Sequence, residues 1–208
     1  MPEPAHDLTD DRQTRPVWRS PGPVAVRDGA GGDFAYADLR GVRLAGWQLQ
    51  GANFRGARLQ GADLRGADVR GTIFDGADLT AADCTAALMQ GARLRRARLD
   101  GACLRQAWLL SAHLEWASVQ GADFTGANCE WAWVEGVDFP TALVACALFL
   151  NVRGLATTAQ RSIEARGGFT GTRPLLLGRE LYDRPLPDAD RTPAGGRGEA
   201  WPRQPLLG

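Results

Sequence analysis

The segment Ala62-Asp63-Leu64-Arg65-Gly66 is one unit of a five-residue pattern that continues from residue 32 to residue 151 without losing phase. In each unit a small residue, most often Ala, stands two positions before a large apolar residue, and Gly follows two positions after it in most units. An α-helix needs apolar residues about every 3.6 positions and a strand every 2, so a strict period of five fits neither. Each unit therefore predicts a short extended segment followed by a bend. The apolar positions are Phe34, Leu39, Leu44, Leu49, Phe54, Leu59, Leu64, Val69, Phe74, Leu79, Cys84, Met89, Leu94, Leu99, Leu104, Leu109, Leu114, Val119, Phe124, Cys129, Val134, Phe139, Val144 and Phe149.

The geometry of one unit follows from these residue types. Ala62 and Leu64 are two positions apart in an extended segment and point the same way, whereas Asp63 and Arg65 point the opposite way. Gly66 tolerates the backbone conformation of a sharp corner. Four such sides close a square, so one coil needs twenty residues and the apolar positions predict six stacked coils. With about 4.8 Å between paired strands, the column should be roughly 29 Å tall.

The repeating units also carry a family resemblance. Ala52-Asn53-Phe54-Arg55-Gly56 and Ala122-Asp123-Phe124-Thr125-Gly126 resemble the repeats of the pentapeptide-repeat family, and the resemblance covers residues 32–151. It implies an all-β solenoid, a right-handed quadrilateral (four-sided) β-helix of about six coils. The residues that follow the repeat predict a short C-terminal capping α-helix. The family says less about function, because its fold carries several activities.

The pattern divides the chain into four parts. Residues 1–31 lack the period and contain several Pro, which predicts a largely disordered N-terminal arm whose patch Val24–Val26 covers the open first coil. Residues 32–151 form the β-helix, residues 152–168 the capping helix, and residues 169–208 a Pro- and Gly-rich tail.

The capping helix is expected from about Thr158 to Arg166. Thr157 and Gln160 have the spacing of a capping box, and Gly167 is suited to end the helix.

Composition and cysteine placement limit the class of protein. The formal net charge is zero, the sequence contains no Lys, and no apolar run approaches the roughly 20 residues of a membrane span. The acidic, Pro-containing N-terminus does not resemble a secretory signal, so we expect a cytoplasmic protein. Cys84 and Cys129 should point into the column, Cys103 outward, and Cys146 should lie at a corner, which disfavours disulfides. No metal site or other cofactor is predicted.

Stacking the sequence in rows of twenty predicts charge ladders on the outside of the column. Side two reads Asp38, Arg58, Asp78, Arg98, Ser118, Asp138, and side one reads Ala35, Arg55, Asp75, Arg95, Glu115, Glu135. Opposite charges one coil apart attract, although each surface pair contributes only about 0 to 1 kcal/mol. We therefore expect these ladders to help fix the register of the coils.

Large apolar residues interrupt the polar exterior of the C-terminal coils. They should form a patch on the column, and patches of this size usually mark a contact. Three interpretations remain open: the protein's own tail from Leu175 to Tyr182 covers the patch, a second copy binds it in a homodimer, or a different protein docks there. The patch residues are Trp108, Leu110, Trp116, Trp131, Trp133, Leu143, Leu148 and Leu150.

Candidate catalytic chemistry is sparse. His113 should point outward beside Glu115, with Arg95 and Trp133 on neighbouring coils, and a His–Glu pair is able to act as a general base. A solvated side chain in a charge ladder is the favoured interpretation, because no nucleophile or pocket accompanies the pair. No enzyme activity, membrane contact or direct nucleic-acid binding is expected.

The sequence supports a non-enzymatic scaffold that presents the Trp/Leu patch to a protein partner or to a second copy. The family resemblance implies an alternative, a DNA-mimicking protein that binds DNA gyrase or a topoisomerase and confers self-immunity or quinolone-type antibiotic resistance. A DNA mimic needs a continuous acidic surface. Residues 32–151 contain thirteen acidic residues and eleven Arg, so the predicted column does not offer one.

Overall fold

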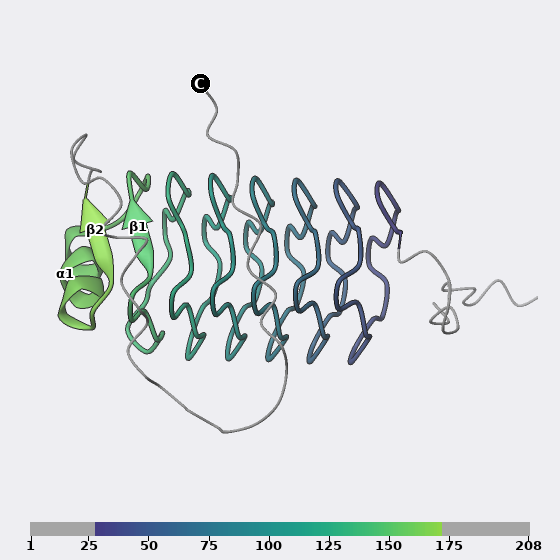
Figure 1. Cartoon of the computed structure of the whole chain (residues 1–208), viewed down its shortest axis with the longest axis horizontal. Coiled ribbons are helices and arrows are strands. Elements are labelled where there is room, and N and C mark those ends of the chain that lie inside the picture. Colours follow the sequence, from purple (N-terminus) through teal and green to yellow (C-terminus); the bar gives the residue numbers. More distant parts are fainter. Residues whose placement is uncertain (1–27, 172–208) are drawn as a thin grey trace, which may run out of the picture. The chain divides into compact units, whose positions relative to one another are not determined.

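The computed structural model describes residues 28–171 of the chain. They form a column of stacked coils that ends in two short strands and one helix, in the order β1 (Leu148–Leu150), α1 (Thr157–Ala165) and β2 (Phe169–Gly171) (Figure 1). The patch Val24–Val26 and the tail segment Leu175–Tyr182, both named as coverings above, lie outside the described residues.

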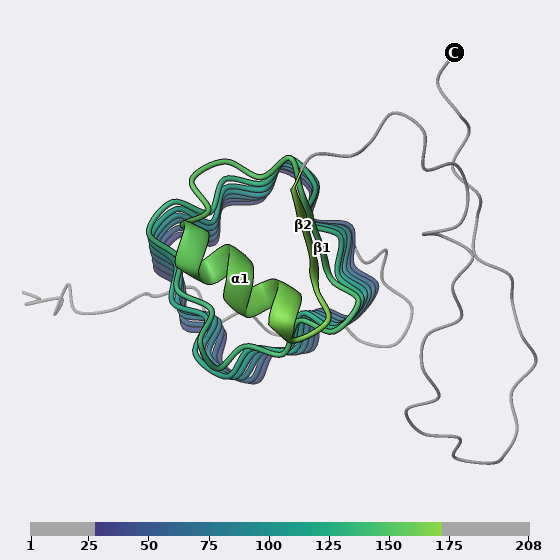
Figure 2. The same ribbon diagram turned by 90° about the vertical axis from the view of Figure 1, so that its left-hand side faces the viewer.

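Parallel pairing between residues twenty positions apart holds the coils together. Asp38 pairs with Arg58 on side two, and Asp33 pairs with Asn53 on side one. The end view shows the four-sided outline that the five-residue period predicted (Figure 2). Pairing begins earlier than residue 32, at Asp28 with Gln48, because Gly29 stands where the pattern would place a large apolar residue and so hides the first side in the sequence.

The corners are tight turns closed by a backbone hydrogen bond. At the first corner of side one, the Ala37 N–H donates to the Phe34 carbonyl over 3.1 Å. Tyr36, the third residue of this turn, has a φ of 60°, the left-handed value that a type II turn requires at that position. Gly fills most of the equivalent positions because it has no Cβ to oppose a positive φ.

The interior of the column is filled as the pattern predicted. Phe34, Phe54 and Phe74 stack above one another on side one, with ring centroids 4.7 Å and 5.3 Å apart. Thr72 replaces Ala at one small position, and its buried hydroxyl donates to the Leu49 carbonyl over 2.8 Å. Each large side chain is thus buried only because the coils above and below it are in place.

The four cysteines are free, and the structure separates them into two pairs by burial. Cys84 and Cys129 are buried, whereas Cys103 and Cys146 are partly exposed. Burial, with smaller contributions from neighbouring groups, raises the pKa of the Cys84 thiol to about 12, and burial also raises the pKa of Cys129.

We therefore expect Cys103 and Cys146 of the folded protein to react with a thiol reagent such as Ellman's reagent at pH 8, and Cys84 and Cys129 to react only after unfolding, because only accessible thiolate is nucleophilic. Absorbance during labelling, followed by peptide mass spectrometry, assigns the modified residues. Uniform, rapid labelling of all four thiols without denaturant would contradict the predicted packing.

The ion pairs follow the predicted ladders only in part. Arg58 reaches Asp38 over 3.8 Å and Arg98 reaches Asp78 over 3.5 Å, both one coil apart, as the ladder pattern predicted. Other pairs form within one coil between residues two positions apart, such as Arg65 with Asp63 at 2.8 Å. An Arg directly after an interior residue points outward beside the acid directly before it, so its long side chain reaches the nearer carboxylate. Arg65 also reaches Asp83 on the next coil over 3.7 Å, so ion pairs within a coil and between coils occur side by side.

The C-terminal helix closes the last coil. α1 crosses the end of the column (Figure 2), and its Ala159 and Ile163 side chains are buried. The predicted capping box does not form: Ala156 is the N-cap without a side-chain hydrogen bond, and the Gln160 amide donates to Glu164 instead. The chain beyond residue 168 also departs from the expected tail, because β2 pairs in parallel with β1 and extends the stack through Gly171.

Candidate interaction surface

The eight residues of the predicted Trp/Leu patch lie on different sides of the column. Trp108 and Leu148 belong to the outward ladder of side four, which runs through Leu88, Trp108, Asn128 and Leu148. Leu143 belongs to the ladder of side three, after Cys103 and Asp123, and is 57% exposed. Leu150 lies in β1 and is buried, so it offers almost no surface to a partner. Leu110 follows an interior residue of side four and is half-buried. One continuous patch of all eight residues is therefore not what the structure shows.

Three of the predicted tryptophans nevertheless gather at one side. Trp133 lies on side one, whose outward ladder passes from Arg93 through His113 and Trp133 to Arg153. Trp131 occupies the corner that leads into this side and is 51% exposed, and Trp116 occupies the corner that leads out of it and is 60% exposed. We call the surface formed by these three aromatic residues the aromatic face.

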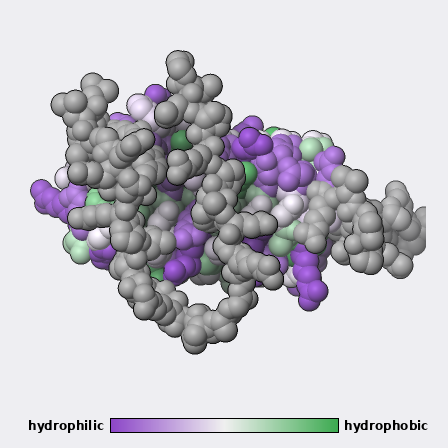
Figure 3. All heavy atoms as spheres, in the orientation of Figure 1, coloured by the Kyte–Doolittle hydropathy of each residue, from purple (hydrophilic) through white to green (hydrophobic). Residues whose placement is uncertain are grey.

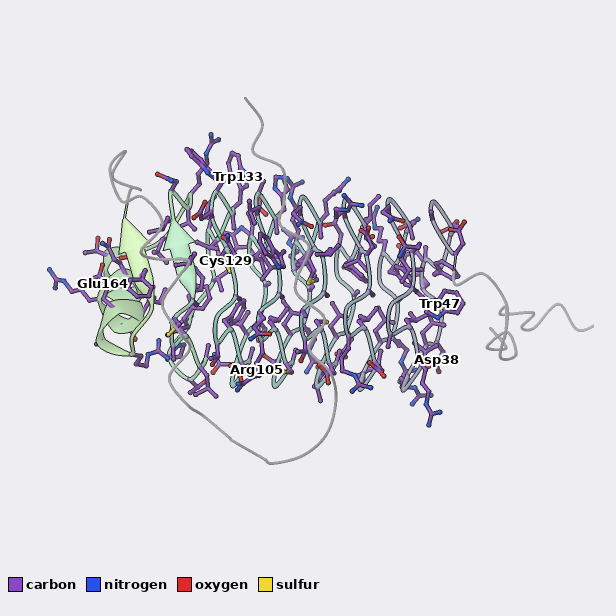
Figure 4. The ribbon with its side chains drawn as sticks, viewed as in Figure 1. Asp38, Trp47, Arg105, Cys129, Trp133 and Glu164 are labelled. Carbon is purple, nitrogen blue, oxygen red and sulfur yellow. The ribbon has the colours of Figure 1, made fainter. Side chains whose placement is uncertain are left out.

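Trp133 projects outward from the coils (Figure 4), but neighbouring groups cover both faces of its ring. His113 stacks on it with ring centroids 5.6 Å apart and planes inclined by 13°, and the Arg153 guanidinium lies 4.4 Å from the ring centroid on the next coil. Such a cation–π contact is worth about 0.5–1 kcal/mol at an exposed site. Trp133 therefore serves mainly to order side one, and the exposed corner tryptophans are the better contact residues.

His113 lies beside Glu115 as the sequence predicted. Its Nδ1 is 3.1 Å from Glu115 Oε1 and 3.2 Å from the Arg95 guanidinium, and Arg95 reaches the same carboxylate oxygen over 3.3 Å. Burial acts to raise the pKa of Glu115, but a backbone hydrogen bond, His113 and Arg95 together outweigh it, and the pKa lies below its usual value. Glu115 is therefore a charged, paired carboxylate at neutral pH, which favours the structural interpretation of the pair.

Backbone strain marks the aromatic corners of this side. Tyr36, Trp116 and Trp131 have φ values of 60°, 62° and 62°, in the left-handed region that bulky residues rarely adopt. The other non-glycine residues with positive φ in the described chain are small, polar or charged. Strain of this kind clusters at functional sites, where it is retained because the side chain is needed.

Two of these rings lie flat on the column because a glycine lies beneath each. A Cβ atom built on Gly56 would come within 2.7 Å of the Tyr36 ring, and one built on Gly136 would come within 2.3 Å of the Trp116 ring. Each glycine is located twenty positions after its aromatic residue, at the same corner one coil further on. The absence of a side chain there lets the ring lie over the next coil, with Tyr36 65% exposed.

A groove of about 680 Å³ runs along this side between the two rings. Tyr36 and Trp116 line it, and the charged residues between them include Arg55, Asp75, Arg93, Arg95, Arg96 and Glu115. Arg93 pairs with Asp75, and Arg95 pairs with Glu115. Within residues 28–171, Arg55, Arg96 and the third acidic residue of the lining, Glu135, form no ion pair, so two guanidinium groups and one carboxylate are unpaired and the groove has an excess of one positive charge. Hydrophilic residues also cover most of the coil surface visible in Figure 3.

The described residues contain no cluster of His, Cys, Asp and Glu that could hold a metal ion. Among the same residues, no helix is both long and apolar enough to cross a membrane. The chemistry of side one is thus that of aromatic surfaces and guanidinium groups, which are the side chains enriched in protein–protein contacts.

The family model for pentapeptide repeats matches residues 37–76, 72–115 and 111–139, with eight copies. The chain belongs to the pentapeptide-repeat family. Its twenty-residue coils form the right-handed quadrilateral β-helix of that family, so the predicted family and fold class are confirmed. No curated protein sequence matches the chain.

Several solved structures match the chain at low sequence identity. A trypsin-treated variant of QnrB1, a plasmid-mediated fluoroquinolone resistance protein, is 19% identical over 70% of this chain and 82% of that chain, with a TM-score of 0.48. Rfr23 from the cyanobacterium Cyanothece 51142 is 26% identical over 46% of this chain and 58% of that one, with a TM-score of 0.33. A protein from the Arabidopsis thaliana thylakoid lumen is 23% identical over 71% and 86%, with a TM-score of 0.26.

Trp116, Trp131 and Trp133 were predicted from the sequence, whereas Tyr36, Arg96 and the groove were not. Tyr36 stands near the start of the repeat, far in sequence from the tryptophans. The signal that would have found it is the aromatic residue at a corner followed by Gly twenty positions later, which occurs at Tyr36 with Gly56 and again at Trp116 with Gly136. The residue pattern alone does not indicate how these rings lie on the column.

Proposed function

We propose that this pentapeptide-repeat protein is a non-enzymatic interaction scaffold that uses the aromatic face of side one to bind a protein partner or a second copy of itself. The observation that carries the proposal is the pair of tryptophans, Trp116 and Trp131, held exposed at strained corners on either side of one face. Exposed Trp is uncommon on a surface without a partner, and Trp is enriched among the residues that dominate binding energy.

The test compares a double variant, Trp116→Ser with Trp131→Ser, with the control Leu143→Ser, which removes an equally exposed apolar residue from side three. Each protein is purified from its native host, bound proteins are quantified by mass spectrometry, and self-association is measured by analytical ultracentrifugation. We expect the double variant to lose a stoichiometric partner or a dimer that the control retains. Equal association of the wild type and the double variant, with unchanged circular dichroism, would contradict the proposal.

DNA gyrase is the alternative partner that the family resemblance implies. A surface that substitutes for DNA should be acidic along its length, whereas ion pairs such as Arg65 with Asp63 neutralise carboxylates of this column, and Arg55 and Arg96 lie in the groove. We therefore propose a partner other than an enzyme that binds DNA. Protection of gyrase supercoiling from a quinolone by micromolar protein would favour the alternative.

A further inference from the structure

The two aromatic rings of the groove, those of Tyr36 and Trp116, lie at the same corner of the column. Tyr36 and Trp116 are eighty positions apart in sequence, which places them at the same corner four coils apart. With about 4.8 Å between coils, the rings are separated by about 19 Å along the column axis. Between them, Gly76 leaves open space where a Cβ would meet no other atom within 4 Å. The groove thus runs along the column axis with an exposed ring at each end, and Gly56, Gly76 and Arg96 occupy the same corner in the three coils between the rings.

An extended peptide matches these dimensions. Its residues advance about 3.3 Å each, so about six residues span the distance between the rings. An even separation matters, because side chains two, four or six positions apart in an extended chain point to the same face. A peptide in the groove can therefore stack a ring-bearing side chain on Tyr36 and another on Trp116. The side chains two and four positions after the first ring then point toward the groove lining.

The charged residues of the groove lining determine which peptide residues fit between the two rings. Arg93 and Arg95 are already paired with Asp75 and Glu115, whereas Arg55 and Arg96 have no ion pair within the described chain. Arg55 lies one coil beyond Tyr36, and Arg96 one coil before Trp116. Each of these guanidinium groups can take a carboxylate in a two-pronged hydrogen bond. Acidic side chains at the positions facing the groove lining would satisfy both.

We infer that the groove of side one binds an extended acidic peptide segment of a partner protein, with an aromatic or proline ring at each end of a stretch of about seven residues and acidic residues between the rings. The inference rests on the proposed function, because it uses the same face, and it names the chemistry of the partner. A single-stranded nucleic acid would also stack on the rings, but it carries one negative phosphate at every nucleotide, whereas a peptide with two acidic residues matches the two guanidinium groups, Arg55 and Arg96, that have no ion pair within the described chain.

The probe is a fluorescein-labelled peptide, Trp-Ser-Glu-Ser-Glu-Ser-Trp, acetylated and amidated at its ends, titrated with the full chain and followed by fluorescence anisotropy. Three competitors complete the design: the same peptide with Lys in place of Glu, a scrambled peptide in which the two Trp are adjacent, and an oligothymidylate of eight nucleotides. We expect binding of the probe, weak competition by all three, and weaker binding at high salt, because screening reduces the charge attraction.

Two sets of variants locate the site. The double variant Arg55→Gln with Arg96→Gln should weaken binding by about tenfold or more, since it removes both unpaired cations. Gly136→Ala should weaken binding because the new Cβ displaces the Trp116 ring, whereas Gly61→Ala, which imposes the same kind of strain at a φ of 63° with nothing nearby, should not. Trp116→Ala provides the same test if Gly136→Ala fails to fold.

Several results would overturn the inference: no binding of the probe, equal affinity for the Lys peptide, stronger binding of the oligothymidylate, or unchanged affinity of the double Arg variant. These results are separate from failure of the proposed function. If the double Trp variant loses the native partner but the peptide does not bind the wild type, the aromatic face remains a docking site. Only the inference that the groove binds an acidic peptide is then rejected. If the peptide binds but no partner or dimer is lost in the double Trp variant, the groove remains a peptide site and the proposed function is removed.

Discussion

Phe54→Ala should lower the free energy of unfolding by about 3–5 kcal/mol, the largest effect expected from a single truncation in the column. Phe54 is 1% exposed, and its ring stacks between Phe34 at 4.7 Å and Phe74 at 5.3 Å. Truncation therefore removes contacts with two coils at once and leaves a cavity that the regular backbone pairing prevents from collapsing. Urea or guanidinium unfolding followed by circular dichroism measures the loss.

Phe54→Leu is the matched control. Leu fills the equivalent position on other sides of the column, for example at Leu59 and Leu64, so the replacement keeps most of the volume and should cost less than about 1.5 kcal/mol. Equal effects of the Ala and Leu variants, or a loss below about 1 kcal/mol for Ala, would show that side one does not depend on its aromatic stack.

Arg166→Gln should release the C-terminal cap, with a local loss of about 2–3 kcal/mol, the range for hydrogen bonds made by a charged group. The corner after side two in the last coil contains Pro140, and no hydrogen bond from the Ala142 N–H closes the turn at Phe139 within the described chain. The Arg166 guanidinium instead donates to the carbonyls of Phe139, Pro140 and Ala142 and to the Ser162 hydroxyl. One side chain of the cap therefore joins α1 to the final coil.

Native-state hydrogen exchange measures this release. The Phe169 amide, which donates to the Ala147 carbonyl over 2.9 Å, should exchange about 30- to 150-fold faster in the variant, because each 1.4 kcal/mol changes an equilibrium tenfold. Amides in the middle of the column should be unaffected. Arg161→Gln is the control, since Arg161 is an exposed arginine of the same helix. Unchanged protection of Phe169 in the Arg166 variant would exclude this role.

The prediction from sequence was strongest where structure depends on residues close together in the chain. The five-residue period placed Ala62 and Leu64 inside, Asp63 and Arg65 outside, and Gly66 at a corner, and the coils confirm this. The weakest prediction concerned which outward side chains meet. Arg65 pairs more closely with Asp63 in its own coil, at 2.8 Å, than with Asp83 on the next coil, at 3.7 Å, because a long flexible side chain selects among several carboxylates within reach.

The candidate site was likewise predicted correctly only in part. The sequence identified the tryptophans as exceptions to a polar exterior, but it treated eight apolar residues as one patch. The structure buries Leu150, places Leu143 on side three, and groups Trp116, Trp131 and Trp133 around side one. Which residues share a surface depends on the corner at which each one stands and on what the next coil places beside it.

By itself, the sequence determined the coil, its length of twenty residues and the filling of its interior, because these follow from the alternation of side chains and from the conformational freedom of Gly within five consecutive positions. Only the tertiary structure decided that Tyr36 and Trp116 lie over Gly56 and Gly136, that Arg55 and Arg96 have no ion-pair partner among residues 28–171, and that Arg166 joins α1 to the last coil. Those features depend on contacts between residues twenty or more positions apart, whose geometry is fixed when the coils stack.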